Sequence, residues 1–552
     1  MTKEHPYHWL RPGSRNFLRM CLLAVVLSAG SLVQAAEIRN DRPAPDESGG
    51  QSVQEDSRLS EVLGIRFTLP RQSTTVYAAL NQLSRETGYY FIYDSDLIDN
   101  DRRIRLPRAT RTMGEFLSEI LEDQTLGYRV LEQHILIYRQ EADAASPVAD
   151  TVETGQPEPR FFSIQGRVLE YGSGNPLPFA SVSIPGKGKG IAANKEGGFA
   201  LRLPMELIDT VVRFSYMGFK AKEMPLRLLT ERNVDVILEA DYISMQEVII
   251  RYYDPNAIIR EALEKRYANY SNHPVYLTSF YREGVQRNTK LMRYSEAVLR
   301  VYKPAYTSIT DSEQVKLLKS RHITNVEATD SLELRLEAGV GSSLELDFMR
   351  NIPDFLNPET IGQYRFVKAD IVSYNSRSTY AIEFIQAARI DEALYMGVLY
   401  VDMETLAFVG AEFEVNPKYV NKDQSIFIRR RSRDYVANIQ RVAYTVRYQQ
   451  FDGRYILEHV RGEISLRFRH RGKFFGNNYT AFFEHAVCHI DTENVRRFQR
   501  RETIRTNTVF SDKVVDYDYS FWGDYNFISP EKEITGGLAD IRAKIQNIVF
   551  DD

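Results

Sequence analysis

Two histidines and a cysteine near the C-terminal end, His485, Cys488 and His489, carry side chains that bind transition metals. On a β-strand, residues 485 and 489 would point to one face and residue 488 to the other, so the three side chains would not converge on one ion. A structural zinc site also needs four ligands. We therefore expect these residues to be structural, and the sequence predicts no metal ligand, no cofactor-binding residue and no catalytic residue.

Other signatures of catalysis or phosphate binding are missing from the sequence. Residues 186–190 read G-K-G-K-G, but they lack the spacing of a phosphate loop and no helix is expected after them, so we interpret them as a mobile β-turn. No histidine is followed three residues later by glutamate, and no G-x-S-x-G sequence occurs. A hydrolase stays one hypothesis, but the sequence offers no convergent nucleophile and base.

The charge of the chain argues against nucleic acid as a partner. The formal net charge is −4, so the chain lacks the positive field typical of nucleic-acid-binding proteins. Two basic runs, Arg429–Arg433 and Arg467–Lys473, are typical of solvated loops. The alternative is contact with the anionic headgroups of lipid or lipopolysaccharide.

The first 35 residues have the pattern of a secretory signal peptide. Three arginines between residues 11 and 19 precede an apolar run, Met20–Leu27, and the small residues Val33 and Ala35 then mark a cleavage site. The run is far shorter than the roughly 20 residues that span a bilayer. Cys21 stands at the beginning of the run, whereas a lipid-modified cysteine would stand at its end. We expect a periplasmic protein, with a partner able to hold it at the outer membrane.

Composition predicts several packed domains. Cleavage would leave 552 − 35 = 517 residues with Cys488 as the only cysteine, so no intramolecular disulfide can form. With 43% apolar residues over this length, three domains are expected. Segments 36–60 and 141–160 lack apolar periodicity, and we expect both to be disordered linkers.

Residues 61–140 predict a small domain with the element order β-α-β-β-α-β-β. A helix over Ser73–Thr87 should end at Gly88, and Thr112 should begin a second helix through a capping box with Glu115. Buried positions are expected at Val76, Leu80, Leu83, Phe116, Leu117, Ile120 and Leu121. The expected strands are Ile65–Leu69, Tyr89–Tyr93, Ile104–Leu106, Tyr128–Leu131 and Ile135–Arg139, with Gly127 ending the second helix.

The segments A-A-L-N-Q-L-S-R-E-T-G-Y and F-L-S-E-I-L-E-D-Q-T-L-G-Y-R-V of this domain resemble the short N-terminal domain of secretins and TonB-dependent receptors. The resemblance implies a periplasmic docking or signalling module. Its partners would be envelope proteins, either an outer-membrane complex or an inner-membrane regulator. The alternative is a simple spacer.

Residues 161–240 consist of short apolar runs separated by turn residues, which is typical of a β-sandwich. The expected strands are Ser163–Glu170, Ala180–Ile184, Phe199–Leu203 and Val211–Tyr216. The pattern G-R-V … G-x-P-L-P-x-A-x-V … N-x-x-G-x-F … S-Y-x-G-F resembles the carboxypeptidase-regulatory-like domain. The resemblance implies a transthyretin-like accessory fold that does not itself catalyse.

After a connector, 241–253, the chain enters a C-terminal domain, 254–552. The connector resembles the segment that leads into the plug of outer-membrane receptors, but about 300 residues are too few for a plug and a receptor barrel. Asp254 and Pro255 are suited to the cap and first position of a helix that should run to Tyr270. Its buried face should contain Ile258, Ala262, Leu263 and Tyr267.

The C-terminal domain alternates apolar and polar residues as antiparallel strands do. The expected strands are Tyr276–Glu283, Leu291–Tyr302, Tyr364–Tyr374, Thr379–Phe384, Gly397–Val401, Ala407–Val415, Asn438–Tyr448, Tyr455–Phe468 and Ala481–Ile490, with a helical stretch around Leu538–Val549. The hairpin over 397–413 resembles one in half-barrel lipoprotein carriers. F-W-G-D-Y-N-F-I-S-P-E, at 521–531, resembles the C-terminus of uncharacterised envelope proteins that carry a regulatory-like sandwich.

The sequence therefore predicts a multidomain α+β protein: a small βαββαββ domain, a β-sandwich, and a mainly antiparallel, half-barrel-like β domain with flanking helices. Its expected function is non-enzymatic docking or signalling in the cell envelope. The alternative is a carrier or sensor of an apolar, lipid-like ligand bound by the C-terminal domain.

Overall fold

The computed structural model describes residues 24–27, 59–93, 98, 102–122, 125–131, 134–139, 161–230, 232–241, 254–308, 310–324, 334–337, 339–422, 424, 435–506, 525–531 and 534–535. Five segments discussed above lie wholly or mostly outside these residues: 36–60, 141–160, 241–253, Arg429–Arg433 and Leu538–Val549. Of the expected signal peptide only strand β1 (Ala24–Leu27) is described, and it pairs antiparallel with β19 (Leu334–Glu337).

Residues 59–139 pack around an apolar core of their own. The helices are α3 (Val76–Thr87) and α4 (Met113–Leu121), and the strands are β2 (Arg66–Leu69), β3 (Gln72–Thr75), β4 (Tyr90–Tyr93), β5 (Arg103–Leu106), β6 (Ala109–Thr112), β7 (Leu126–Leu131) and β8 (His134–Arg139). The capping box is present: Thr112 Oγ1 accepts from Glu115 N at 3.3 Å, and Glu115 Oε2 accepts from Thr112 N at 2.8 Å. The seven predicted helix positions are all buried.

The predicted βαββαββ order is wrong where each helix begins. Strands β3 and β6 stand directly before α3 and α4, so Ser73 to Thr75 are extended and Thr75 is the N-cap of α3. Threonine favours this arrangement because its branched side chain suits a strand and its hydroxyl can cap the next helix. Gly127 lies inside β7, since α4 already ends at Leu121 with Glu122 in the left-handed conformation.

Residues 161–241 form the β-sandwich. Its strands are β9 (Phe161–Glu170), β10 (Ser181–Ile184), β11 (Lys189–Ala192), β12 (Gly198–Pro204), β13 (Val211–Ser215), β14 (Lys222–Pro225) and β15 (Asn233–Leu238), with short helices η1 (Met205–Leu207) and η2 (Leu226–Leu228). One sheet has the order β12-β9-β15, with β15 parallel to β9, and the other β14-β13-β10-β11. Gly166 is needed where β9 meets β15, because a Cβ there would lie 1.9 Å from Val234 O.

The G-K-G-K-G segment is only partly the turn that the sequence predicts. Gly186 and Gly188 turn the chain with φ values of 70° and 58°. Lys189 and Gly190 already belong to β11, which pairs with β10 and, through Lys189 and His489, with the large sheet. The segment therefore forms part of a sheet junction.

The large sheet of the C-terminal region is open and antiparallel. Its strands are β16 (Val275–Arg287), β17 (Lys290–Lys303), β18 (Gln314–Thr324), β20 (Tyr364–Tyr374), β21 (Arg377–Gln386), β22 (Tyr395–Asp402), β23 (Phe408–Val415), β24 (Tyr435–Phe451), β25 (Arg454–His470) and β26 (Asn477–Asp491). The pairing order is β18-β17-β16-β26-β25-β24-β23-β22-β21-β20. All nine predicted strands occur in it, whereas β18 was not predicted. The turn before β23 is closed by Asp402 Oδ1, which accepts from Glu404 N at 3.0 Å and from Thr405 N at 2.7 Å.

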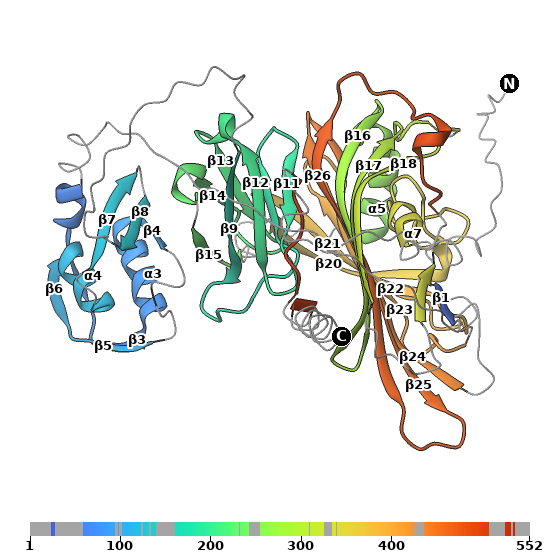
Figure 1. Cartoon of the computed structure of the whole chain (residues 1–552), viewed down its shortest axis with the longest axis horizontal. Coiled ribbons are helices and arrows are strands. Elements are labelled where there is room, and N and C mark those ends of the chain that lie inside the picture. The colour runs from blue at the N-terminus through green and yellow to red at the C-terminus, as the bar shows by residue number, and fades with distance from the viewer. Residues whose placement is uncertain are drawn as a thin grey trace, which may run out of the picture.

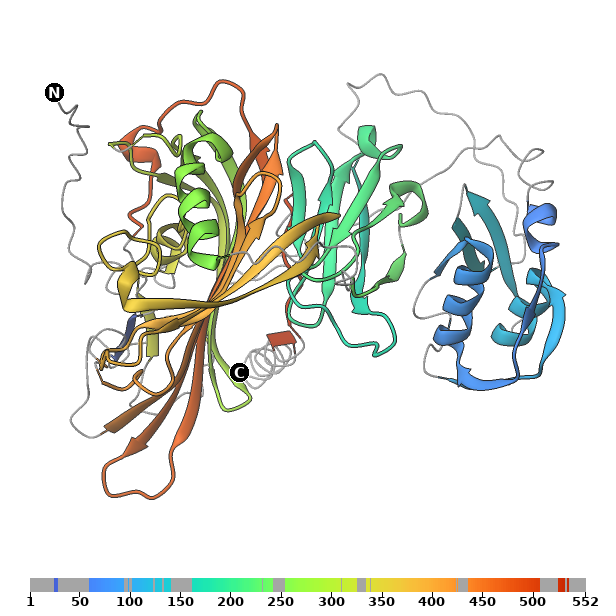
Figure 2. The same ribbon diagram turned by 180° about the vertical axis from the view of Figure 1, so that it is seen from behind.

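One face of this sheet packs against the chain's own helices, α5 (Pro255–Glu264), α6 (Arg266–Asn269) and α7 (Gly339–Glu345), which lie on the side away from the sandwich (Figure 1; Figure 2). Apolar residues of α5, of α7 and of the segment 346–356 are buried in the same core as the sheet. Asp254 Oδ1 caps α5 by accepting from Asn256 N at 3.0 Å. Tyr267 is 41% exposed, contrary to the prediction, because α5 ends at Glu264 and α6 starts a new turn.

The opposite face of the sheet shares a core with the sandwich. Phe280, Val298, Ala486 and Cys488 of the sheet are buried among the apolar residues of the sandwich. The sandwich and the large sheet are therefore joined by a continuous core. Among the described residues, no helix has both the length and the apolar character needed to cross a bilayer. A short helix η3 (Ile361–Gln363) precedes β20, and η5 (Arg500–Glu502) follows β26.

Candidate functional site: a buried charge cluster between the sandwich and the sheet

Five charged residues lie side by side on the face of the large sheet that the sandwich covers. They alternate in sign on neighbouring strands at directly opposed positions, in the order Arg321 (β18), Glu296 (β17), Arg282 (β16), Glu484 (β26) and Arg461 (β25). Each is at most 6% exposed. Opposite charges at opposed positions favour this pairing of the strands, and a slip by one residue would break it.

Glu484 is at the centre of this charge cluster. Its Oε2 lies 2.6 Å from the guanidinium of Arg282 and 3.1 Å from Arg461 Nη1, and its Oε1 lies 2.7 Å from His459 Nε2. Burial alone would raise the pKa of Glu484, but Arg282, the hydrogen bond from His459 and Arg461 together hold it well below its usual range. Glu484 is therefore a permanent buried anion at neutral pH.

The segment 525–531 supplies a second carboxylate, Glu531. Its Oε1 lies 3.2 Å from Arg282 Nη2 and 3.0 Å from Arg461 Nη1. Arg282 Nη1 also donates to Ser529 O at 3.3 Å. Two arginines and two carboxylates thus satisfy one another away from solvent, which is the condition under which buried charges are tolerated.

The sandwich closes the charge cluster from the other side. Phe179, just before β10, stacks on His459 with ring centroids 5.4 Å apart and lies 5.0 Å from the guanidinium carbon of Arg461. Asn194, in the turn before β12, donates from Nδ2 to Ser529 O at 3.1 Å. Sheet, sandwich and the 525–531 segment therefore meet at one place.

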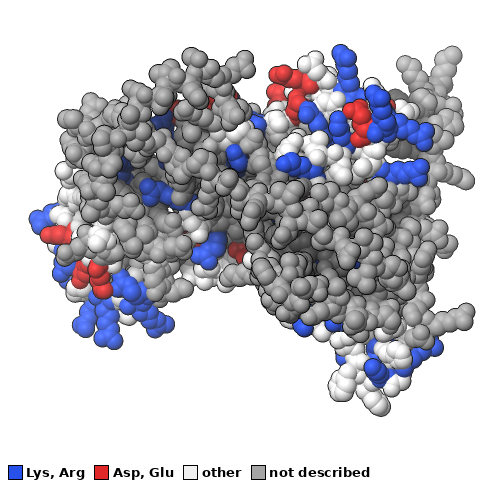
Figure 3. Space-filling model, in the orientation of Figure 1, with Lys and Arg blue, Asp and Glu red and all other residues white. Residues whose placement is uncertain are grey.

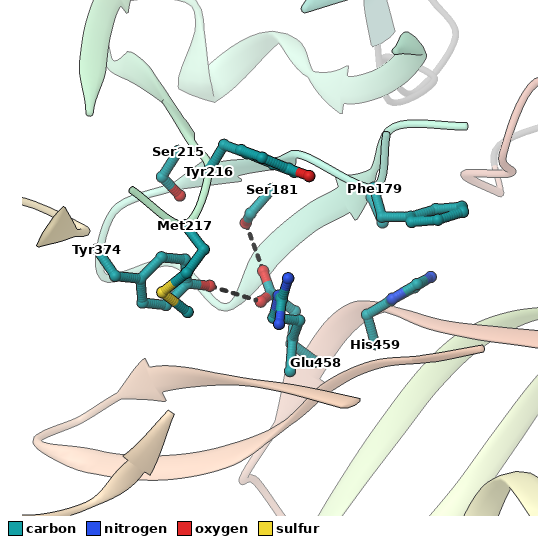
Figure 4. A pocket seen from close by; sticks show the side chains of 10 residues that line it. Phe179, Ser181, Ser215, Tyr216, Met217, Tyr374, Glu458 and His459 are labelled. Carbon is teal, nitrogen blue, oxygen red and sulfur yellow. Dashed lines mark hydrogen bonds between the residues drawn. The ribbon is translucent and has the colours of Figure 1, made fainter. Parts of the chain in front are cut away.

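A small polar cavity lies beside the cluster (Figure 4). Glu458 stands at its centre and accepts hydrogen bonds from Ser181 Oγ and, at 3.3 Å, from Tyr374 Oη. Three buried atoms that line it have no protein partner among the described residues: Ser215 Oγ, Arg447 Nη1 and His459 Nδ1. The cavity volume is 10 Å³, about that of one water probe, so the site does not admit a metabolite.

A serine–histidine pair on the opposite face of the sheet does not form a nucleophilic site. Ser343 Oγ lies 3.0 Å from His485 Nδ1, but it donates to Val340 O at 2.7 Å and both side chains are fully buried. Burial, with the charges of Lys303 and His459, lowers the pKa of His485 to about 3, so the imidazole is a very weak base. The pair instead fixes α7 on the sheet.

The expected arrangement of His485, Cys488 and His489 is wrong in one respect. Ser279 pairs with Val487 and Thr278 with His489, so Cys488 is the extra residue of a β-bulge. Cys488 and His489 consequently lie on the sandwich side, where His489 Nδ1 is 3.4 Å from Gly188 O, whereas His485 lies against α7. The structure thus separates His485 from the other two, and burial raises the pKa of the Cys488 thiol to about 12.

The charge cluster was not found from the sequence. Glu484 stands in a strongly apolar run, A-F-F-E-H-A-V, and a charge in such a run could have indicated a buried partner. Arg282 stands in the mixed run S-F-Y-R-E-G, which carries no such signal. The sequence marked the segment 521–531 only by its resemblance to the C-terminus of other envelope proteins, and it did not predict a role for Glu531. Its described part, 525–531, holds Glu531 and the buried Ile528 between sandwich and sheet.

Two solved structures are similar to part of the chain. A DUF1329 family protein from Desulfovibrio piger is 14% identical over 46% of this chain and 100% of its own, with a TM-score of 0.19. Lipovitellin, in a structure titled for lipid–protein interactions, is 7% identical over 43% of this chain and 27% of its own, with a TM-score of 0.21. A search of curated proteins finds no match.

One family model matches the chain, over residues 164–250, and it describes the CarboxypepD_reg-like domain. The match covers most of the sandwich and includes Phe179, which packs on His459 and Arg461, and Asn194, which donates to Ser529 O. The sandwich predicted at 161–240 is thus a carboxypeptidase-regulatory-like domain in fold and in sequence.

Proposed function

We propose that this protein is a non-enzymatic docking adaptor of the cell envelope. In this proposal the sandwich and the large sheet form one rigid body, and the unit 59–139 binds a protein partner. One observation carries the proposal: the charges of the buried cluster are enclosed and paired with one another within the protein, at the junction of the sandwich and the large sheet. Such a cluster specifies one arrangement of the two parts at a junction, and it offers no reacting group to a substrate.

The unit 59–139 is the proposed docking module because its core is separate from the core that joins sandwich and sheet. Its resemblance to the short N-terminal domain of secretins and TonB-dependent receptors supports an envelope partner, either an outer-membrane complex or an inner-membrane regulator. The expected signal peptide supports export to the periplasm. A shallow hollow at the start of α4, near Gly64, Arg111 and Ser118, offers one surface for a partner.

The alternative, a carrier of an apolar ligand, would require the large sheet to expose its apolar face. In the structure α5, α7 and the segment 346–356 occupy that face, and Phe348, Phe355 and Leu356 are fully buried in the shared core. A ligand would have to displace them. We therefore prefer docking to carriage.

The deciding experiment is cross-linking in intact cells with the full chain and with a chain that lacks residues 61–139. The deletion should remove the cross-linked partner while leaving thermal unfolding of the remainder unchanged, because the remaining core does not include these residues. Ser118→Arg, in the hollow at α4, should weaken recruitment, whereas Arg105→Glu, exposed on β5, should not. Recruitment of every partner by the deleted chain would show that this unit is only a spacer.

A further inference from the structure

The hairpin between β25 and β26 projects away from the body of the molecule (Figure 1; Figure 2). Its two strands are 17 and 15 residues long, and cross-strand pairing continues outward to Phe468 and Asn477. We call residues 467–476 the hairpin tip. Strand β24 also pairs with β25 as far out as His470, so the turn stands on paired strands and is not a free loop.

Two adjacent phenylalanines in the hairpin tip follow the turn that Lys473 N closes by donating to His470 O at 3.0 Å. Phe474 is 91% exposed and Phe475 is 88% exposed. The buried apolar core of the hairpin ends at Phe468 and Tyr479, whose ring centroids are 5.5 Å apart. Phe474 and Phe475 are therefore not required for folding, and two neighbouring exposed phenylalanines mark an interaction site.

Cations surround the two phenylalanines. Arg467, Arg469, Arg471 and Lys473 are all exposed, and the sequence contains no acidic residue between Glu463 and Glu484. Basic side chains gather at the lower end of the space-filling view, where the hairpin tip lies (Figure 3). The hairpin tip thus carries four positive charges together with two exposed apolar rings.

The base of the hairpin is braced by its neighbour. Asn288, in the turn between β16 and β17, donates from its backbone N to Asn478 O at 2.7 Å, and its Oδ1 accepts from Asn478 N at 3.0 Å. This brace keeps the hairpin extended. The phenylalanines are consequently held away from every apolar core of the described chain.

We propose that the hairpin tip docks on the surface of a membrane that contains anionic phospholipid. Phe474 and Phe475 enter the boundary between headgroups and acyl chains, while Arg469, Arg471 and Lys473 contact lipid phosphates. Exposed apolar rings and cations on one projecting turn match the boundary of an anionic bilayer, where acyl chains meet charged headgroups. A flat protein interface would instead surround an apolar centre with polar groups in one plane. This site uses residues that the docking of unit 59–139 does not involve.

Vesicle flotation of the full chain tests the proposal. We expect binding to vesicles that contain phosphatidylglycerol, weaker binding to phosphatidylcholine vesicles, and loss of binding as salt is raised. The double substitution Phe474→Ser with Phe475→Ser should weaken binding at least about tenfold, since both rings would otherwise leave water on binding. Arg471→Ser with Lys473→Ser should remove the preference for the anionic lipid.

Matched controls use exposed residues elsewhere. Val367→Ser removes an exposed apolar side chain from β20, and Arg500→Ser with Arg501→Ser removes two exposed cations, so neither variant should alter flotation. Unchanged thermal unfolding of the tip variants would verify that they fold. A tryptophan placed by Phe475→Trp should be quenched by brominated lipid.

Two outcomes would overturn the proposal: no flotation with either vesicle, or equal flotation of the tip variants and the parent chain. Normal flotation of the tip variants together with loss of a cross-linked acidic protein would assign the hairpin tip to a protein partner instead.

Discussion

Arg282 on β16 and Glu484 on β26 lie directly opposite each other, and their side chains form an ion pair of 2.6 Å that is fully buried. The two residues are 202 positions apart in the chain. Arg461 and Glu531 complete the network from two other segments. A buried ion pair is costly to desolvate, and its best attested use is to specify one arrangement of the parts that it joins.

Removing one partner of this pair should destabilise the junction strongly. Glu484→Gln leaves the guanidinium of Arg282 with less countercharge in a buried place, and we expect a loss of about 3–5 kcal/mol in the free energy of unfolding. Urea unfolding followed by far-UV circular dichroism measures it. Glu414→Gln, which breaks the partly exposed pair with Arg441, should cost less than about 1 kcal/mol. Equal effects of the two substitutions would contradict a structural role of the buried pair.

The carboxyl group of Glu345 should make the protein less stable as pH rises. Burial at the end of α7, with Glu313 nearby, raises its pKa from 4.5 to about 7. The folded state therefore binds the proton more tightly than the unfolded state, so stability is highest below about pH 4.5 and falls until about pH 7.

Glu345→Gln should remove this pH dependence. Near pH 8 the variant should be more stable than the parent by up to about 3 kcal/mol, whereas near pH 5 the two should differ little. Thermal melts at both pH values measure the difference. An equal shift at both pH values would show that the effect is not due to ionisation of Glu345.

The reactivity of the Cys488 thiol should measure how often the sandwich and the large sheet separate. It is 4% exposed, its pKa is raised to about 12 by burial, and its Sγ lies 3.7 Å from Asn526 O of the segment that joins sandwich and sheet. A disulfide reagent should react with it only when sandwich and sheet separate. In a Cys21→Ser background, Glu484→Gln should accelerate labelling at least about tenfold, whereas Glu414→Gln should not. Fast labelling of the parent chain would show that the junction opens freely.

An environment-sensitive fatty-acid probe should give no saturable signal with the full chain. The apolar face of the large sheet is occupied by α5, α7 and the segment 346–356, which leave little room for an acyl chain. The isolated region 254–552 is unsuitable for this titration, because removing the sandwich would expose Phe280 and Val298. Saturable binding that Phe355→Ala strengthens would favour the carrier alternative.

Local patterns in the sequence predicted the elements that depend on near neighbours. The capping box of Thr112 and Glu115, the cap at Asp254 and the alternation of β20 all rest on contacts within a few residues or on one face of one strand. The same reasoning failed where two local signals competed, as at Ser73–Thr75, where strand and helix cap use the same threonine-rich segment.

The sequence by itself determined the strand-rich character of the chain, the sandwich and most strands of the large sheet, because hydrophobic alternation and turn residues act locally. Only the tertiary structure decided which strands are neighbours, and hence that Arg282 meets Glu484 and that Glu531 reaches both arginines. The same holds for the bulge at Cys488, which places His489 on the opposite face from His485. These pairings depend on loop closure over hundreds of residues and on the fit of complete surfaces, neither of which is visible in any short stretch of sequence.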